Sequence, residues 1–122
     1  MTKHAWVAIL TVSALGVLSA TALAQGTKVQ NALGETLYEL HIAKPNPGPL
    51  GYDWGANLLP KPIPRGATLT VDLPKALDAC IYDFLVTGRD GADWEVTGVD
   101  LCKAHTITFR HTTTGGVAYS GK

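Results

Sequence analysis

The sequence has 122 residues, of which 46% are hydrophobic and 16% are charged, and ten basic residues balance ten acidic ones. Nucleic acids and anionic membrane surfaces are bound largely through clustered Lys and Arg. No run of three like charges occurs in the chain. The composition therefore argues against nucleic acid or a membrane surface as the main partner.

The first 24 positions carry much of this hydrophobicity. Lys3 and His4 precede an uncharged stretch, Val7–Ala24, which ends in Ala22-Leu23-Ala24. A short basic start, an apolar stretch and a small-x-small ending are typical of a secretory signal peptide. We therefore predict a signal peptide at residues 1–24, with export to a periplasm or the extracellular space. No later segment approaches the length of about 20 apolar residues needed to span a membrane.

Both cysteines of the sequence, Cys80 and Cys102, follow the predicted leader. An even number of cysteines in an exported chain predicts a disulfide. In the chain-entropy model this loop contributes roughly 3.4 kcal/mol to stability. Two unpaired buried thiols are the alternative, and a redox pair is disfavoured because the spacing is far from Cys-x-x-Cys. No residue pattern calls for a cofactor.

Beyond the leader, hydrophobic residues alternate with polar ones at period two, which is typical of β-strands. Their outward residues are of mixed polarity, which is compatible with a monomer or a weak oligomer. We predict an all-β domain at residues 25–110: a small antiparallel β-sandwich or partly open barrel of six to seven strands. The expected strands are 28–33 (the weakest candidate), 37–44, 68–73, 79–87, 93–101 and 105–109.

Glycines mark two irregular points in this pattern. The alternation of Asp93–Leu101 changes phase at Gly98, which predicts a β-bulge. Asp90-Gly91 is a favoured hairpin turn between the two flanking strands. Residues 111–122 contain Thr and Gly but little strand pattern, and we predict a flexible C-terminal tail.

The segment Pro45–Pro64 has six prolines and little strand character. Long irregular loops in small domains are uncommon and often functional. The candidate binding residues are Tyr52, Asp53, Trp54 and Asn57, since exposed aromatic rings beside polar groups suit the recognition of a sugar, a peptide or a ring. Alternatively, Trp54 plugs one end of the sandwich while Asp53 or Asn57 caps loop amides.

Three motifs give the chain a family resemblance. They are W-G-x-N-L-L at Trp54–Leu59, Cys80-Ile81-Tyr82-Asp83, and Val99-Asp100-Leu101-Cys102. In this order they resemble a group of small exported bacterial proteins, mostly proteobacterial, with no established function. The likeness covers residues 28–109. It implies a signal-bearing, β-rich domain and supplies no catalytic residues.

Other chemistries have weaker support. Asp90, Asp93 and Glu95 could offer oxygen ligands to Ca²⁺, but their spacing is not that of an EF-hand loop. The histidines after the leader lack a metal-binding spacing. They are His41, His105 and His111.

Catalysis has little support either. The one serine after the leader is Ser120, and no nucleophile motif surrounds it. Asp83 and Asp100 could form a carboxylate pair in a small hydrolase, but paired acids need a cleft that separates their pKa values. Asp83 lies in an otherwise apolar strand, and we expect it to accept hydrogen bonds from loop or turn amides.

These patterns favour a non-enzymatic binding or structural module that uses Pro45–Pro64 and binds a protein or a small molecule. The alternative function is an inhibitor or accessory domain of an exported enzyme.

Overall fold

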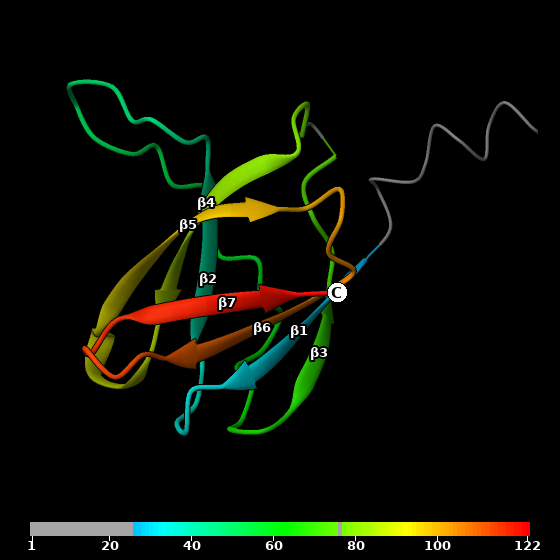
Figure 1. Cartoon of the computed structure of the whole chain (residues 1–122), viewed down its shortest axis with the longest axis vertical. Helices are drawn as coiled ribbons and strands as arrows, with labels where there is room; N and C mark the ends of the chain where they lie inside the picture. The colour runs from blue at the N-terminus through cyan, green and yellow to red at the C-terminus, as the bar shows by residue number, and fades with distance from the viewer. Residues whose placement is uncertain (1–25, 76) are drawn as a thin grey trace, which may run out of the picture.

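The computed structural model describes residues 26–75 and 77–122, so the predicted signal peptide lies outside the described residues. The described chain forms seven strands in two sheets, with a short 3₁₀ turn, η2, between the fourth and fifth strands (Figure 1). No helix in these two ranges is long and apolar enough to cross a bilayer. The elements are β1 (Thr27–Ala32), β2 (Glu39–Ala43), β3 (Thr68–Val71), β4 (Ile81–Thr87), η2 (Arg89–Gly91), β5 (Asp93–Asp100), β6 (Thr106–His111) and β7 (Val117–Gly121).

The two sheets have the strand orders β3-β1-β6-β7 and β2-β4-β5. The all-β prediction with one disulfide is therefore confirmed, and β4 is central in its sheet. One pairing differs from an antiparallel sandwich: β1 runs parallel to β6, with Val29 opposite Ile107. A parallel pair joins segments far apart in sequence, so no local turn signal announces it.

The core lies between the sheets and follows the period-two pattern. Phe84 of β4 and Phe109 of β6 are each at most 1% exposed, and their ring centroids lie 5.9 Å apart across the two sheets. In β2, Leu40 and Ile42 face this core, whereas Tyr38, which precedes the strand, is 44% exposed. Burial of these large apolar side chains contributes about 1.5–3 kcal/mol each.

The predicted bulge at Gly98 is confirmed. The β4–β5 register passes from Tyr82 opposite Val99 to Phe84 opposite Val96, so β5 carries one extra residue. Gly98 has a φ of 72°, a left-handed conformation that costs other residues about 1–2 kcal/mol. The bulge points the Gly98 amide toward Asp83, which lies opposite it.

The prediction of a flexible tail at residues 111–122 is wrong. β6 extends to His111, and β7 pairs with it in antiparallel register. The Tyr119 hydroxyl donates a hydrogen bond to the Gly98 carbonyl oxygen at 3.1 Å, which fastens β7 to the bulge of β5. The Thr- and Gly-rich segment 112–116 is a hairpin turn, so the domain continues past residue 110.

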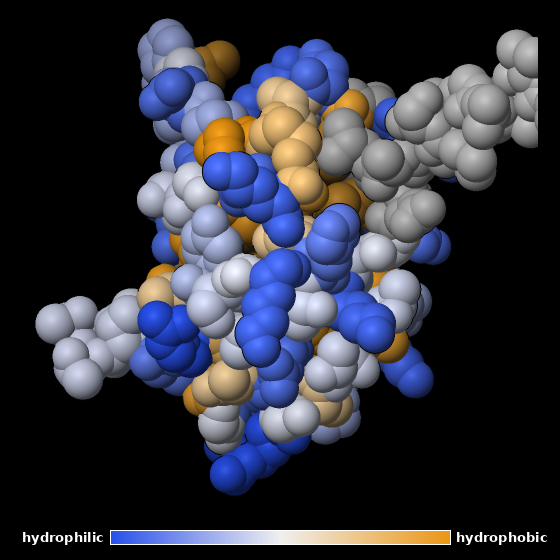
Figure 2. Space-filling view, turned by 45° about the vertical axis from the view of Figure 1, so that its right-hand side comes forward, coloured by the Kyte–Doolittle hydropathy of each residue, from blue (hydrophilic) through white to orange (hydrophobic). Residues whose placement is uncertain are grey.

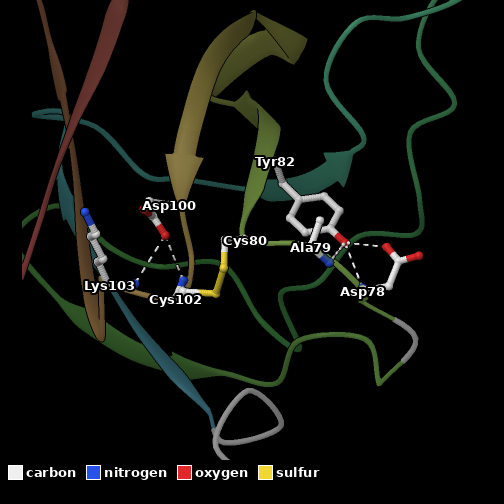
Figure 3. The surroundings of a disulfide bond; sticks show 7 residues. All are labelled: Asp78, Ala79, Cys80, Tyr82, Asp100, Cys102 and Lys103. Carbon is white, nitrogen blue, oxygen red and sulfur yellow. Dashed lines mark hydrogen bonds between the residues drawn. A yellow bond between two sulfur atoms is a disulfide. The ribbon is translucent and has the colours of Figure 1, made fainter.

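Cys80 and Cys102 form the predicted disulfide, which joins the start of β4 to the turn after β5 (Figure 3). Asp100 Oδ1 stabilises that turn by accepting hydrogen bonds from the amides of Cys102 and Lys103. A structural disulfide of this kind is typical of proteins in an oxidising compartment.

Candidate functional site

The connection from β2 to β3 contains no named strand or helix, and it projects from the sandwich at the upper left of Figure 1. We divide it into a finger, Pro45–Trp54, and a return segment, Gly55–Pro64. These two parts differ in how they contact the sheets.

The return segment covers the free edge of β2. The Leu58 amide donates to the Leu40 carbonyl oxygen at 2.8 Å, and the Gly55 amide donates to that of Ile42 at 3.1 Å. Asn57 Oδ1 accepts hydrogen bonds from the amides of Leu40 and Leu59 at 2.9 and 3.0 Å. Asn57 therefore holds the backbone in place, the role that the structural alternative assigned to it, and the edge of β2 is shielded from other strands.

The last part of the return segment contacts a buried asparagine of β1. Asn31, in β1, is fully buried, and its amide nitrogen donates to the carbonyl oxygens of Glu35 and Ile63 at 2.7 and 2.8 Å. Its Oδ1 accepts from the Leu33 amide at 2.9 Å. Sequence reasoning missed this residue. The available signal was a polar side chain at an inward position of an alternating strand, where burial requires hydrogen-bond partners.

The finger ends in a tight turn. The Gly51 amide donates to the Gly48 carbonyl oxygen at 3.0 Å, and Gly51 has a φ of 91°. Leu50, between these glycines, is 100% exposed. Figure 2 shows hydrophobic colour at the end of the projecting segment. The turn thus holds a leucine side chain in solvent, away from the core.

A buried carboxylate anchors the base of the finger. Asp83 is only 3% exposed, and its Oδ2 accepts a hydrogen bond from the Tyr52 hydroxyl at 2.7 Å. Its Oδ1 accepts from the Gly98 amide at 2.9 Å. The hydrogen bond to Asp83 raises the pKa of Tyr52 to about 12, with smaller contributions from burial and from the negative charges of Asp83 and Glu95. One side chain of β4 therefore joins the finger to the bulge of β5.

The two aromatic rings of the finger stack on each other. The ring centroids of Tyr52 and Trp54 lie 4.4 Å apart with an interplanar angle of 25°. Of the neighbouring hydrophobic residues in the described chain, Leu58 and Leu59 contact the core, whereas Trp54 is not among the side chains packed against it. Leu58 and Leu59 thus pack against the core, while half-buried Trp54 stacks on Tyr52.

A pocket of about 410 Å³ opens between the finger and the sandwich. Its floor includes the buried side chains of Ile42 and Tyr82, and Pro74 and Leu77 form part of the wall. Lys44 and Asp53 are the charged residues of its lining. Of the four predicted binding residues, Tyr52 and Asp53 line the pocket, whereas Trp54 and Asn57 belong to the stack and to the edge of β2.

The predicted carboxylate pair is not gathered in this pocket. Asp83 holds Tyr52 and Gly98, while Asp100 accepts from turn amides beside the disulfide. Asp83 therefore does what the sequence indicated, since it accepts from a bulge amide, and a tyrosine hydroxyl is its second donor.

Two of the three acidic residues near the β4–β5 turn have local structural roles. Asp93 Oδ1 accepts a hydrogen bond from the Thr87 hydroxyl at 2.7 Å. Asp90 occupies the turn with a φ of 59°. Within the described ranges, the side chains grouped closely enough to hold a metal are Cys80, Asp100 and Cys102, whose two sulfurs are joined to each other.

Two of the histidines join neighbouring segments. The ring nitrogens of His41 lie 2.7 Å from the Gly55 carbonyl oxygen and 2.9 Å from Glu39 Oε1. Near the β4–β5 turn, His111 Nε2 lies 3.4 Å from Glu35 Oε2, and its ring contacts Trp94 edge-on. Hydrogen bonds to the Arg89 amide and to His111 lower the pKa of Glu35, with charge interactions adding to the effect. Glu35 therefore joins the β1–β2 connection to Arg89 in η2 and to His111 at the end of β6.

Comparison with known proteins adds little to this geometry. No family model matches the chain, and no curated protein matches it. The resemblance stated on the W-G-x-N-L-L motif therefore stays a hypothesis. An NMR structure of a protein from Eubacterium rectale is similar over 80% of this chain and 88% of that chain, with 7% identity and a TM-score of 0.46.

Proposed function

We propose that this chain is an exported, non-enzymatic binding domain whose recognition surface is the finger Pro45–Trp54 together with the pocket at its base. The observation that carries the proposal is the hydrogen bond from the Tyr52 hydroxyl to the buried Asp83 carboxylate. It fixes an otherwise irregular segment to the rigid sandwich. Binding through a prearranged loop costs less conformational entropy than binding through a loop that must first become ordered.

The finger also offers what a recognition surface needs. Leu50 is fully exposed at the tip, and the mainly apolar pocket lies beside it. Apolar anchors surrounded by polar groups carry much of the energy of protein interfaces. The predicted leader and the disulfide support a site of action in a periplasm or outside the cell.

The inhibitor alternative is weakened by the shape of the tip. Peptides recognised through main-chain hydrogen bonds to a sheet edge bind in an extended form. The hydrogen bond between Gly51 and Gly48 instead folds the tip into a turn. The geometry therefore favours a side-chain anchor over a segment that mimics an extended substrate.

Site-specific photo-crosslinking tests the proposal. A photoreactive amino acid replaces Leu50, or as a control Thr114, which is exposed in the turn between β6 and β7. Both proteins are irradiated with the exported fraction of the source cells. We expect discrete adducts from position 50 alone, competed by excess wild-type protein and not by the Leu50→Asp variant. Equal adduct patterns from both positions would overturn the proposal.

A further inference from the structure

The fingertip and the pocket lie on the same part of the molecule, yet the tip does not fill the pocket. Leu50 is 100% exposed, while Pro47 and Tyr52, on either side of the tip, line the cavity. An exposed apolar side chain beside an open apolar pocket is a self-complementary pair. A two-fold arrangement in which each tip enters the other copy's pocket would be isologous, the kind of contact common in homodimers.

The charges around the pocket fit this arrangement. Its lining contains one cation, Lys44, and one anion, Asp53. In a two-fold pair where Lys44 of one copy meets Asp53 of the other, symmetry supplies the reverse contact as well, so two opposite-charge contacts form at once. The ion pair of Lys44 with Asp78 within one copy spans 3.9 Å between side chains more than 70% exposed, so it holds Lys44 weakly.

The size of the surface indicates the class of interface that it can form. A standard interface buries about 800 Å² per partner with roughly 20–30 residues a side. The pocket lining comprises fourteen residues, to which the tip adds Pro49 and Leu50. The contact therefore falls somewhat below the standard size, as in weak and reversible complexes.

We propose that the occupant of this surface is a second copy of the chain, bound reciprocally with each Leu50 inserted into the partner's pocket. The inference rests on the proposed function, because it names the partner of the same finger. The protein is accordingly a weak dimer, whose association depends on the tip and on the charge pair between Lys44 and Asp53.

Sedimentation velocity from about 1 μM to about 1 mM measures this association directly. The full sequence is expressed in a host that forms disulfides and is recovered as the cell processes it. We expect reversible dimerisation of the wild type. Leu50→Asp weakens it at least about tenfold, because the substitution places a charge in an apolar pocket. Thr114→Asp, a charge added at the other end of the sandwich, leaves it unchanged.

Charge reversal tests the geometry of the dimer. Lys44→Asp and Asp53→Lys each bring like charges together in a homodimer, so each variant is more monomeric than the wild type. An equimolar mixture of the two restores both opposite-charge contacts, and we expect it to form heterodimers. A mixture that stays monomeric would contradict the two-fold arrangement.

Two other outcomes would overturn the inference. One is a wild type that stays monomeric across the range, and the other is a Leu50→Asp variant that dimerises as well as the wild type. If the wild type stays monomeric while position 50 still crosslinks to a different protein, the proposed function stands and only the second copy is excluded. If the wild type dimerises, Leu50→Asp does not, and position 50 crosslinks only to a second copy of this chain, the inference stands and recognition of a different protein is excluded.

Discussion

Replacing Asp83 with alanine removes the acceptor that joins the finger to the sandwich. The carboxylate accepts two hydrogen bonds, at 2.7 and 2.9 Å, from the Tyr52 hydroxyl and the Gly98 amide. A hydrogen bond to a charged group contributes about 1.5–3 kcal/mol, so the two together are worth roughly 3–6 kcal/mol. Both donors lie near solvent and regain water, and the burial cost of the charge disappears. We therefore expect a net loss of about 2–3 kcal/mol.

Thermal unfolding followed by circular dichroism measures this loss. In a domain of about 100 residues, a loss of 2–3 kcal/mol lowers Tm by about 10–20 °C. Asp83→Asn is the matched control, because its amide oxygen still accepts from Gly98 and its NH₂ group donates to the Tyr52 oxygen. We expect Asp83→Asn to cost less than about 1 kcal/mol. An Asp83→Ala variant that melts within a few degrees of the wild type would refute the anchoring role of this carboxylate.

The ionisation of Tyr52 gives an independent measure of the same contact. Its pKa is raised to about 12 by the hydrogen bond to Asp83, above the ordinary value of 10.0. The contact therefore contributes its full stability below pH 10 and loses it as the pH rises through 12. We expect ultraviolet titration to show this tyrosine ionising closer to pH 10 in Asp83→Asn. An unchanged alkaline titration would contradict the assignment.

Three further variants test other parts of the fold. Cys102→Ala is expected to lower stability by about 3 kcal/mol in denaturant melts under non-reducing conditions, and by less under reducing conditions. Equal losses under the two conditions would contradict the disulfide. Tyr119→Ala removes the contact of β7 with Gly98, and we expect a loss of about 2–3 kcal/mol in the same melts, whereas a neutral result would restore the flexible tail. The pKa of Glu35 is lowered, so its charge stabilises the fold at pH values above 4.5, the ordinary value, and this stabilisation disappears as the pH falls through the lowered pKa. Glu35→Gln should therefore lower Tm at neutral pH and converge with the wild type in acid, and a constant difference in Tm would contradict this origin.

The strands and the bulge were predictable because their signals are local. Alternating burial in β1 and β6 follows directly from alternating residues, and Gly98 interrupts the alternation where β5 carries its extra residue. The disulfide was equally accessible, since two cysteines allow only one pairing.

What the sequence could not predict depends on segments far apart in the chain. The parallel pairing of β1 with β6 joins strands with no turn between them. Asp83 was recognisable as an acceptor, but its donor Tyr52 lies 31 positions away on an irregular loop. The strand β7 was missed because a Thr- and Gly-rich hairpin turn resembles the start of a tail, and its pairing with β6 is a tertiary property.

The central claim is that the Tyr52–Asp83 hydrogen bond holds the finger in a fixed position before any partner binds. Backbone order parameters from ¹⁵N relaxation, measured for the finger residues Gly51–Trp54 in the wild type and in Tyr52→Phe, test it most directly. We predict values near about 0.85 in the wild type, typical of rigid backbone, and a fall below about 0.6 when the hydroxyl is removed. Low values in the wild type, or equal values in both proteins, would contradict the claim.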